Sequence, residues 1–505
     1  MIYSVRIFTA ISIACLTGFY FQRAWGLEHG NDYSARDRLF GLDRKDKVIH
    51  LGFFPLVLPI GLCIIFAGFI AKLGWHDGLF SFFRLSVDLL LTMSLYYTAL
   101  LLLMPLLRRR ISARACATAW LFPAFLYYVG YSFLVIRPHV VLYFPNRLLN
   151  RLIPVWFAGF VLFFGTAVLS HLYFRRKVMR TSHAERDASV LRIWQQESER
   201  LGFKTPIRLV RWEPAKTPFS MADTKRSRMT VLPDCPYKEQ ELRLIFRHEL
   251  HHLQRNDTDA GIFLSFLRAL FWFHPLVWIA LREASRDIEL SCDEIVLDES
   301  DDNDRRLYAD LLLNTAGERH GFTTCLSADA RSLRYRLRHV MQKRTCRTGT
   351  WTLMVLLFTC LMCHGIFALS DERTTLGEVF PLESMDFCLY ETAGELSYSD
   401  TELTDESRNA LLSSLKALPV EHLSGGRRAD IASQSPRLYL SSQDMSLCMW
   451  LCDGSIVIYD LDNIDLNHST VYYIRGDIDW EKIEACFTQH APSIVLKNLV
   501  LTCTS

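Results

Sequence analysis

The amino-acid sequence predicts a polytopic α-helical membrane protein with a mainly α-helical cytoplasmic domain and a small α+β domain outside the membrane. Half of the 505 residues are apolar and the mean hydropathy is +0.12. The chain is therefore more apolar than a single soluble domain usually is. Charge is divided along the chain: residues 371–505 hold 22 acidic and nine basic residues, a net charge of −13. With +2 overall, the first 370 residues carry +15. A membrane that separates the two parts explains this division.

Six apolar runs define the expected membrane spans, each near the ~20 residues that cross a bilayer. They cover roughly residues 3–22, 48–73, 84–107, 116–137, 155–174 and 350–369. The first run has no evident cleavage site followed by a polar start, so we expect it to remain as a span. The predicted domains are therefore a multi-span region over 1–174, a cytoplasmic domain over 175–349, a last transmembrane helix over 350–369 and an extracytoplasmic domain over 370–505.

Basic residues in the short loops set the expected orientation, because cytoplasmic loops are enriched in Lys and Arg. Such residues occur between the first and second runs, between the third and fourth, and after the fifth. Another cluster precedes the last run and consists of Arg334, Arg336, Arg338, Lys343, Arg344 and Arg347. The N-terminus and residues 370–505 are then external, and residues 175–349 face the cytoplasm.

A motif with metal-binding spacing lies inside the cytoplasmic segment. Residues 237–255, "YKEQELRLIFRHELHHLQR", contain no Gly or Pro and repeat apolar residues at helical spacing. On this helix His248 and His252 share a face, as two imidazoles on one tetrahedral ion require. Glu249 beside them can accept a proton from a metal-bound water. The alternative is a solvated, His-rich helix face, and His251 is a further neighbour of His248.

The third ligand is expected from "RDIELSCDEIVL", residues 286–297, where Glu289 and Asp293 are four residues apart on a second predicted helix. A catalytic zinc site needs three protein ligands and an open position. Glu289 is the predicted ligand, and Asp293 can hydrogen-bond a ligating imidazole to fix its tautomer. A solvated acidic face is the alternative, and Cys292 is the substitute ligand if Glu289 is wrong.

The apolar stretch 259–281 between the two motifs constrains the chain path. A single crossing would separate His252 from Glu289 by ~30 Å, which one ion cannot bridge. Pro275 interrupts the stretch. We therefore predict a bent or re-entrant hairpin that dips into the bilayer or packs on the neighbouring spans, with the site at the cytoplasmic membrane surface.

These features together resemble the BlaR/MecR-type antirepressor membrane metallopeptidases of bacteria. The resemblance covers roughly residues 85–345 and rests on an order of segments. These are "LRIWQQESERLGFKTPIRLV", "TPFSM" at 217–221, "MTVLPD", "HELHHLQRND", "FWFHPLVW", "ELSCDEIVL" and "RLYADLLL". It implies a zincin-like peptidase domain in the bacterial cytoplasmic membrane.

Carried over to this chain, the resemblance implies Zn²⁺ on His248, His252 and Glu289. Glu249 would be the general base, and Asp293 would orient a ligand. Arg255 and Asp257 would be structural at the end of the motif helix, with an exposed charge pair as the alternative. The strand "TPFSM" would be an edge strand that pairs with an extended substrate, or else an ordinary protected edge.

The resemblance also implies the partners. The substrate would be a cytoplasmic transcriptional repressor, with self-cleavage in the linker between about residues 298 and 347. The lipid bilayer and an unknown extracytoplasmic ligand complete the expected partners, and a homodimer is left open. No nucleic-acid motif occurs, and the Arg clusters are better explained by topology.

The C-terminal segment departs from the best-known family members, whose external sensor is a penicillin-binding domain of about twice this length. Ser413 and Lys416 have the spacing Ser-x-x-Lys, but we interpret them as part of an amphipathic helix. The alternation around Asp453 and Gly454 predicts a β-hairpin, and residues 477–487 a short capped helix. Five cysteines in this segment allow at most two disulfides. We predict a small α+β ligand-sensing or partner-binding module.

Two other functions remain open. A CAAX-prenyl-protease-like membrane protease shares His-Glu-x-x-His and a later Glu-x-x-x-Asp, but it has no need of an external acidic domain. A non-proteolytic receptor would use the metal site as a structural element.

Overall fold

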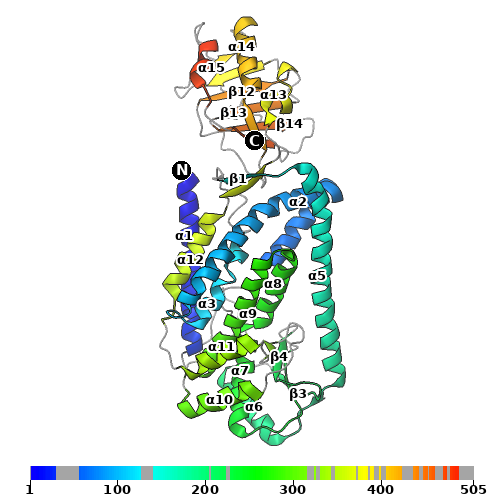
Figure 1. The fold of residues 1–505 in the computed structure, drawn as a ribbon, viewed down its shortest axis with the longest axis vertical. Helices are drawn as coiled ribbons and strands as arrows, with labels where there is room; N and C mark the ends of the chain where they lie inside the picture. Colours follow the sequence, from blue (N-terminus) through cyan, green and yellow to red (C-terminus); the bar gives the residue numbers. More distant parts are fainter. Residues whose placement is uncertain are drawn as a thin grey trace.

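The fold of the chain was analysed in a computed structural model (Figure 1). It describes residues 2–29, 56–126, 140–203, 206–222, 228–298, 300–314, 324–325, 330–342, 347–364, 366–370, 374–384, 387–391, 397–399, 405–422, 436–442, 447–452, 454–460, 470–474 and 478–487. The N-terminus and the C-terminal sheet lie at one end, and α6, α7 and α10 lie at the other (Figure 1).

Long apolar helices form the middle of the molecule. α1 (Ile2–His29), the second half of α2 (Val57–Leu107) and α5 (Asn146–Thr181) each contain a stretch that is long and apolar enough to cross a membrane: Arg6–His29, Leu89–Leu107 and Arg147–Thr181. Pro59–Trp75 and α12 (Thr350–Cys363) are apolar but shorter. These helices coincide with five of the six predicted runs. The number of crossings and their orientation stay predictions.

The fourth predicted run, 116–137, is not a single helix in its described part. α3 (Ala113–Ala119) is seven residues long and buried, and a 3₁₀ turn (Phe122–Phe125) follows it. Trp120 is fully buried between them, and its indole donates to Asp287 at 2.7 Å. Residues 127–137 lie outside the described residues. The apolar character of this segment thus comes from packing against other helices, which periodicity does not distinguish from lipid contact.

α2 bends back on itself at Gly74, where φ is +77°. This left-handed conformation suits glycine because it has no Cβ. A second glycine, Gly78, lies where an added Cβ would meet the Phe69 carbonyl oxygen at 2.7 Å. Two glycines therefore permit the close approach of the two arms, in the interval between the predicted runs 48–73 and 84–107.

The stretch 259–281 forms a helical hairpin. α8 (Asp257–Leu270) leads through a turn into α9 (Pro275–Val296), with Pro275 at the start of the second helix, where its missing N–H costs nothing. Phe263, Leu267 and Val277 are fully buried in the main helical core, together with side chains of α2, α3 and α12. The hairpin returns the chain to the end where α8 began. Its depth in a bilayer stays a prediction.

A five-stranded sheet and four helices form the end of the molecule that carries the motif. The strands are β2 (His183–Ala184), β3 (Arg208–Arg211), β4 (Phe219–Ala222), β5 (Arg228–Leu232) and β6 (Thr324–Cys325), in the order β2-β3-β5-β4-β6. Among the described pairings of this sheet, only β3–β5 is parallel. The helices are α6 (Ala188–Arg200), α7 (Glu239–Arg255), α10 (Asp302–Asn314) and α11 (Ala330–Met341).

The prediction that β4 is an edge strand is wrong for its first half. Phe219 pairs with Cys325 and Ser220 pairs with Thr324, so β6 covers this part of the strand. β6 comes from the linker after α10, where no strand was predicted from the sequence. β4 also packs against α7. A segment of the same chain, β6, is therefore paired with the sheet next to the motif helix.

The C-terminal segment folds as an antiparallel sheet of eight strands with helices packed on it. The strand order is β10-β9-β12-β13-β14-β15-β11-β8. The strands are β8 (Thr374–Thr375), β9 (Phe387–Glu391), β10 (Ser397–Ser399), β11 (Pro419–His422), β12 (Arg437–Ser441), β13 (Leu447–Cys452), β14 (Ser455–Asp460) and β15 (Thr470–Ile474). The helices are α13 (Leu376–Val379), α14 (Asp405–Lys416) and α15 (Trp480–Phe487). They share a core with the sheet.

The predicted β-hairpin and the predicted helix around Ser413 are both present in this segment. β13 and β14 form a hairpin in which Cys452 pairs with Ser455, and Gly454 in the turn has a φ of +72°. Ser413 lies inside α14 and its hydroxyl donates to the Ala410 carbonyl, as in an ordinary helix. The four described cysteines of this segment, Cys388, Cys448, Cys452 and Cys486, are not joined in disulfides.

A short parallel pair connects this segment to the helices. β1 (Val140–Tyr143), just before α5, pairs with β7 (Phe367–Ser370), just after α12. The Tyr143 hydroxyl also donates to Glu421 in β11. The C-terminal segment is thus attached at the start of α5 and the end of α12.

Candidate metal centre

Helix α7 carries the His-Glu-x-x-His motif and is anchored on one face. Its N-terminus is capped where the Lys238 N–H donates to the Glu241 carboxylate at 2.8 Å. Its apolar residues are buried, and Phe246 packs edge-on against Trp194 of α6 with ring centroids 4.9 Å apart. Asn256 ends the helix with a φ of +59°. Asn tolerates this left-handed conformation well, and the reversal sets Asp257 beside the last turn of α7.

Three side chains converge on one point, as the sequence predicted for the candidate ligands. The Nε2 atoms of His248 and His252 are 3.0 Å apart. Glu289 Oε2, from α9, lies 3.7 Å from the first and 3.9 Å from the second. Donors about 2.0–2.2 Å from a tetrahedral ion lie roughly 3.3–3.5 Å from one another. The three atoms therefore have spacings suited to a zinc ion.

Hydrogen bonds at the far side of each ring fix which nitrogen faces the centre. His252 Nδ1 lies 2.7 Å from Asp257 Oδ2, and because a carboxylate only accepts, the ring donates there. The Tyr308 hydroxyl donates to Asp293 Oδ1 at 2.7 Å, so its oxygen accepts from His248 Nδ1 at 2.9 Å. Both Nε2 atoms then turn their lone pairs toward the same point, and a cation there relieves their repulsion.

The electrostatics of the two rings differ. Burial lowers the pKa of His248 to about 4, which keeps that ring neutral. Burial also acts to lower the pKa of His252, but the neighbouring Cys292 sulfur and Asp257 carboxylate outweigh it and raise that pKa well above 6.5. A proton between the two Nε2 atoms and a metal ion thus compete for one place. The donor set, two imidazoles and one carboxylate, is a known catalytic zinc set, so the residues fit the ion.

The two carboxylates of α9 are held by one guanidinium. Arg336 of α11 donates from Nε and Nη2 to Asp293 at 2.7 and 2.6 Å, and its Nη1 lies 3.2 Å from Glu289 Oε2. Burial acts to raise the pKa of Glu289, but His248 and Arg336 reverse this and lower it to about 2. Glu289 is therefore ionised and available as a ligand at neutral pH.

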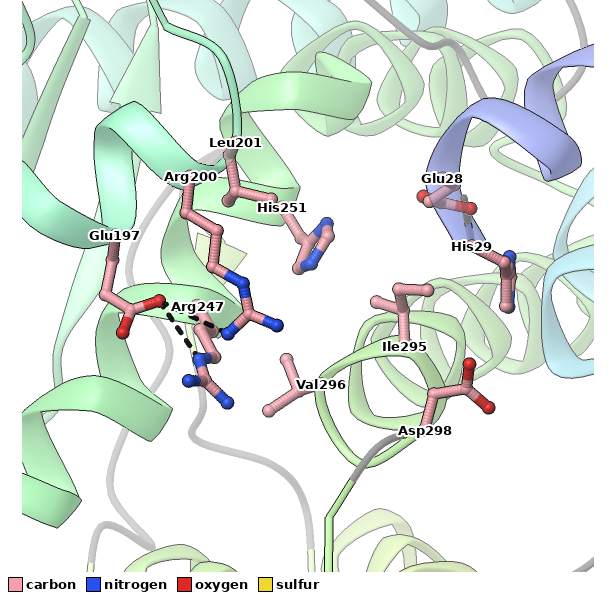
Figure 2. A pocket seen from close by; sticks show the side chains of 10 residues that line it. All are labelled: Glu28, His29, Glu197, Arg200, Leu201, Arg247, His251, Ile295, Val296 and Asp298. Atoms are coloured by element: carbon pink, nitrogen blue, oxygen red, sulfur yellow. Dashed lines mark hydrogen bonds and ion pairs between the residues drawn. The ribbon is translucent and has the colours of Figure 1, made fainter. Parts of the chain in front are cut away.

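The other residues of the motif face different surroundings. Glu249 is fully buried beside His248, and its role in catalysis stays a proposal. His251 lines a cavity of about 50 Å³ together with Glu28 and His29 (Figure 2). Of the two histidines, His252 is the one whose Nε2 lies 3.0 Å from His248 Nε2, and this geometry favours it as the partner of His248.

Cys292 lies behind His252 and does not replace Glu289 in the group of three. Its Sγ is 3.4 Å from His252 Nδ1 and 3.6 Å from Asp257 Oδ2. These atoms form a second group of potential donors, but it uses the nitrogen that Asp257 already occupies. The group around both Nε2 atoms is the better metal site.

Arg255 and Asp257 are buried, so the exposed charge pair weighed in the sequence analysis is wrong. Arg255 donates to Glu28 at the end of α1 and to the Ser291 hydroxyl of α9 at 2.7 Å. Glu28 also pairs with Arg114 of α3. The end of the motif helix is thus joined to α1, α3 and α9 by buried ion pairs and hydrogen bonds.

Sequence reasoning missed three residues of this site: Asp257, Tyr308 and Arg336. Asp257 was interpreted only as structural, and Arg336 only as one of a basic cluster that indicates topology. A signal for Arg336 was present, because it falls on the apolar stripe of α11 with Leu333, Leu337 and Val340. Arg334 and Arg338, off that stripe, are exposed.

Comparison with known proteins identifies the segment that carries this site. Residues 137–340 match the family described as BlaR1 peptidase M56. Over 182 residues, 36% of the chain, the sequence is 24% identical to the Regulatory protein BlaR1 of Bacillus licheniformis. The match covers 30% of that relative's length. Residues 137–340 are thus similar to the M56 peptidases, and this segment contains the motif helix α7 and the helix α9 that carries Glu289.

Proposed function

We propose that the protein is a membrane-embedded zinc endopeptidase that acts in signal transduction. The observation that carries the proposal is the convergence of His248 Nε2, His252 Nε2 and Glu289 Oε2 within 3.0–3.9 Å. The M56 family of residues 137–340 supports peptidase chemistry at this place. Long apolar helices beside it support a location in the bacterial cytoplasmic membrane.

Each residue of the site has a proposed role in peptide hydrolysis. Zn²⁺, when bound by His248, His252 and Glu289, supplies Lewis acidity toward water and the scissile carbonyl. Glu249 accepts the proton of the attacking water and later donates it to the leaving amine. Asp257 holds the tautomer of His252, and Asp293 acts on His248 through the Tyr308 hydroxyl. No covalent intermediate with the protein is needed.

The proposed substrate is a cytoplasmic repressor protein, by analogy with the family and with a relative named as a regulatory protein. Self-cleavage within the linker 298–347 is part of the proposal. It is supported by β6, a piece of this linker that pairs with β4 next to the motif helix. The sheet of residues 374–487 is the proposed receiver of an extracytoplasmic signal.

The variant Glu249→Gln tests the enzymatic part. It removes the proton acceptor but leaves the three metal-binding atoms in place. We expect the purified variant to hold one equivalent of zinc and to cleave nothing, and quantitative proteomics of cells with either protein to show substrates that accumulate intact with the variant. If cleavage and signalling persist in Glu249→Gln while zinc stays bound, the protein is a receptor with a structural metal.

A second variant separates a signal transducer from a CAAX-prenyl-protease-like enzyme. Deletion of residues 371–505 removes the C-terminal sheet and leaves the metal centre and its helices. A transducer should lose induced cleavage in this variant. A membrane protease without a sensing function should keep the same rate with and without the segment.

A further inference from the structure

Helix α11 connects the metal centre to the last apolar helix of the chain. It ends at Met341, and α12 begins at Thr350. One face of α11 packs into the core of the peptidase domain through Leu333, Leu337 and Val340. Arg336 lies on this same face with no exposed surface. A buried guanidinium requires acceptors around it, because an unpaired buried charge is costly.

The acceptors of Arg336 are two carboxylates one helical turn apart on α9. Asp293 takes two parallel hydrogen bonds, at 2.7 and 2.6 Å, in the fork geometry that favours arginine over lysine. The remaining nitrogen, Nη1, lies 3.2 Å from Glu289 Oε2. The planar guanidinium of Arg336 therefore fixes the distance between the carboxylates of Asp293 and Glu289.

One of these carboxylates, Glu289, is itself a candidate ligand. The other, Asp293, is connected to a second candidate ligand, His248. Glu289 Oε2, the oxygen beside Arg336, is the same atom that lies 3.7 and 3.9 Å from the imidazole nitrogens. Asp293 Oδ1 accepts from Tyr308, whose oxygen accepts from His248 Nδ1. Arg336 thus contacts Glu289 directly and is connected to His248 by a chain of three hydrogen bonds through Asp293 and Tyr308.

We propose that Arg336 is a positioning residue of the metal centre, which orients Glu289 and, through Asp293 and Tyr308, His248. This inference rests on the proposed zinc site. Arg336 contacts both carboxylates, so without its guanidinium neither Glu289 nor Asp293 would be held in its present position. Loss of Arg336 should therefore weaken metal binding and change the coordination geometry.

The rival explanation is that Arg336 only anchors α11. Arg305 of α10 offers a matched control, because it also ties α11 in place. It donates from Nη1 to the Val340 carbonyl at 3.1 Å and from Nη2 to the Leu297 carbonyl at 2.8 Å. Both acceptors are main-chain oxygens of residues that are not candidate ligands. Arg305→Gln should loosen α11 without disturbing the ligands.

Cobalt binding to the purified full-length protein in detergent distinguishes the two explanations. Cobalt(II) replaces zinc in sites of this kind, and its visible absorption reports coordination geometry. The wild-type protein, Arg336→Gln, Arg336→Lys and Arg305→Gln are titrated with Co²⁺ alone. We expect Arg336→Gln to raise the Kd for Co²⁺ about 10–100-fold, the usual effect of losing an outer partner of a ligand, and to shift the absorption bands. Arg336→Lys should fall between it and the wild type.

The result for Arg305→Gln decides the interpretation. We expect it to lower the unfolding temperature while the cobalt spectrum and Kd stay those of the wild type. Equal spectra for Arg336→Gln and the wild type, or the same Kd change in Arg305→Gln, would overturn the proposal. If Arg336→Gln is not recovered folded, a wild-type cobalt spectrum in Arg336→Lys would likewise overturn the proposal. A wild-type protein that binds no cobalt would instead remove the proposed zinc site itself.

Discussion

The contact between Asp257 and His252 gives the most direct test of the metal centre. Asp257 is five residues after His252 and reaches it only because the chain reverses at Asn256. Its Oδ2 accepts from His252 Nδ1 at 2.7 Å, and both side chains are buried. Asp257→Asn keeps the shape of the side chain. The amide can, however, present its NH₂ to Nδ1, which moves the ring proton to Nε2, the atom that should face the metal.

The size of the expected loss in zinc affinity follows from this contact. Replacing an outer carboxylate partner of a zinc-bound histidine usually weakens metal binding 10–100-fold, which corresponds to about 1.4–2.8 kcal/mol. The buried surroundings and the short distance place Asp257→Asn toward the upper end. Zinc affinity is measured by competition with a chromogenic chelator on the detergent-solubilised protein at pH 7.5.

Asp259→Asn is the matched control. Asp259 belongs to the same first turn of α8, and its carboxylate accepts from the Asn256 side chain without contacting the histidine. We expect a zinc Kd within about twofold of the wild type for this variant. An unchanged affinity in Asp257→Asn, or an equal loss in both variants, would refute the assignment of Asp257 as the residue that holds the tautomer of His252.

Three further predictions concern protonation, ion pairs and the start of the last apolar helix. The pKa of His252 is raised, so below it a proton occupies the metal position, and the zinc affinity measured by competition should fall about tenfold per unit of decreasing pH. Glu28→Gln leaves Arg114 and Arg255 buried without their shared carboxylate, which should cost about 3–5 kcal/mol and appear as a lower unfolding temperature; an unchanged temperature would contradict it. Gly349→Ala puts a Cβ 2.8 Å from the Ala115 Cβ of α3 and 2.9 Å from the Ile111 Cβ, at a φ of +86°, and should destabilise the protein by about 1–3 kcal/mol, seen as a lower unfolding temperature.

The sequence was sufficient for the parts of the structure that depend on local periodicity and spacing. His248 and His252 are four residues apart on an amphipathic helix, so their shared face followed from helical geometry alone. Glu289 required a further argument, because a single ion cannot be reached from both sides of a bilayer. That constraint predicted a reversal between residues 259 and 281, and α8 and α9 have this form.

Other features depended on contacts between distant segments, which spacing does not encode. Arg336 is 84 residues after His252 and looked like one more loop arginine. The strand β6 consists of two residues, Thr324 and Cys325, whose pairing with β4 comes from tertiary structure and not from strand propensity. The run 116–137 was apolar enough for a span, yet α3 is short and encloses Trp120 among other helices.

The position of Glu289 is determined by the whole length of α9 and not by its own turn. Asp287 accepts two hydrogen bonds from Arg108 at the end of α2, at 2.8 and 2.9 Å. Ser291 contacts the end of α7, and Asp293 contacts α11. Three neighbouring elements thus hold α9 on either side of the ligand. Sliding α9 by one turn, about 5.4 Å, would break all of these buried contacts together. The structure therefore presents Glu289 from a rigid element, as a metal site with little tolerance in ligand distance requires.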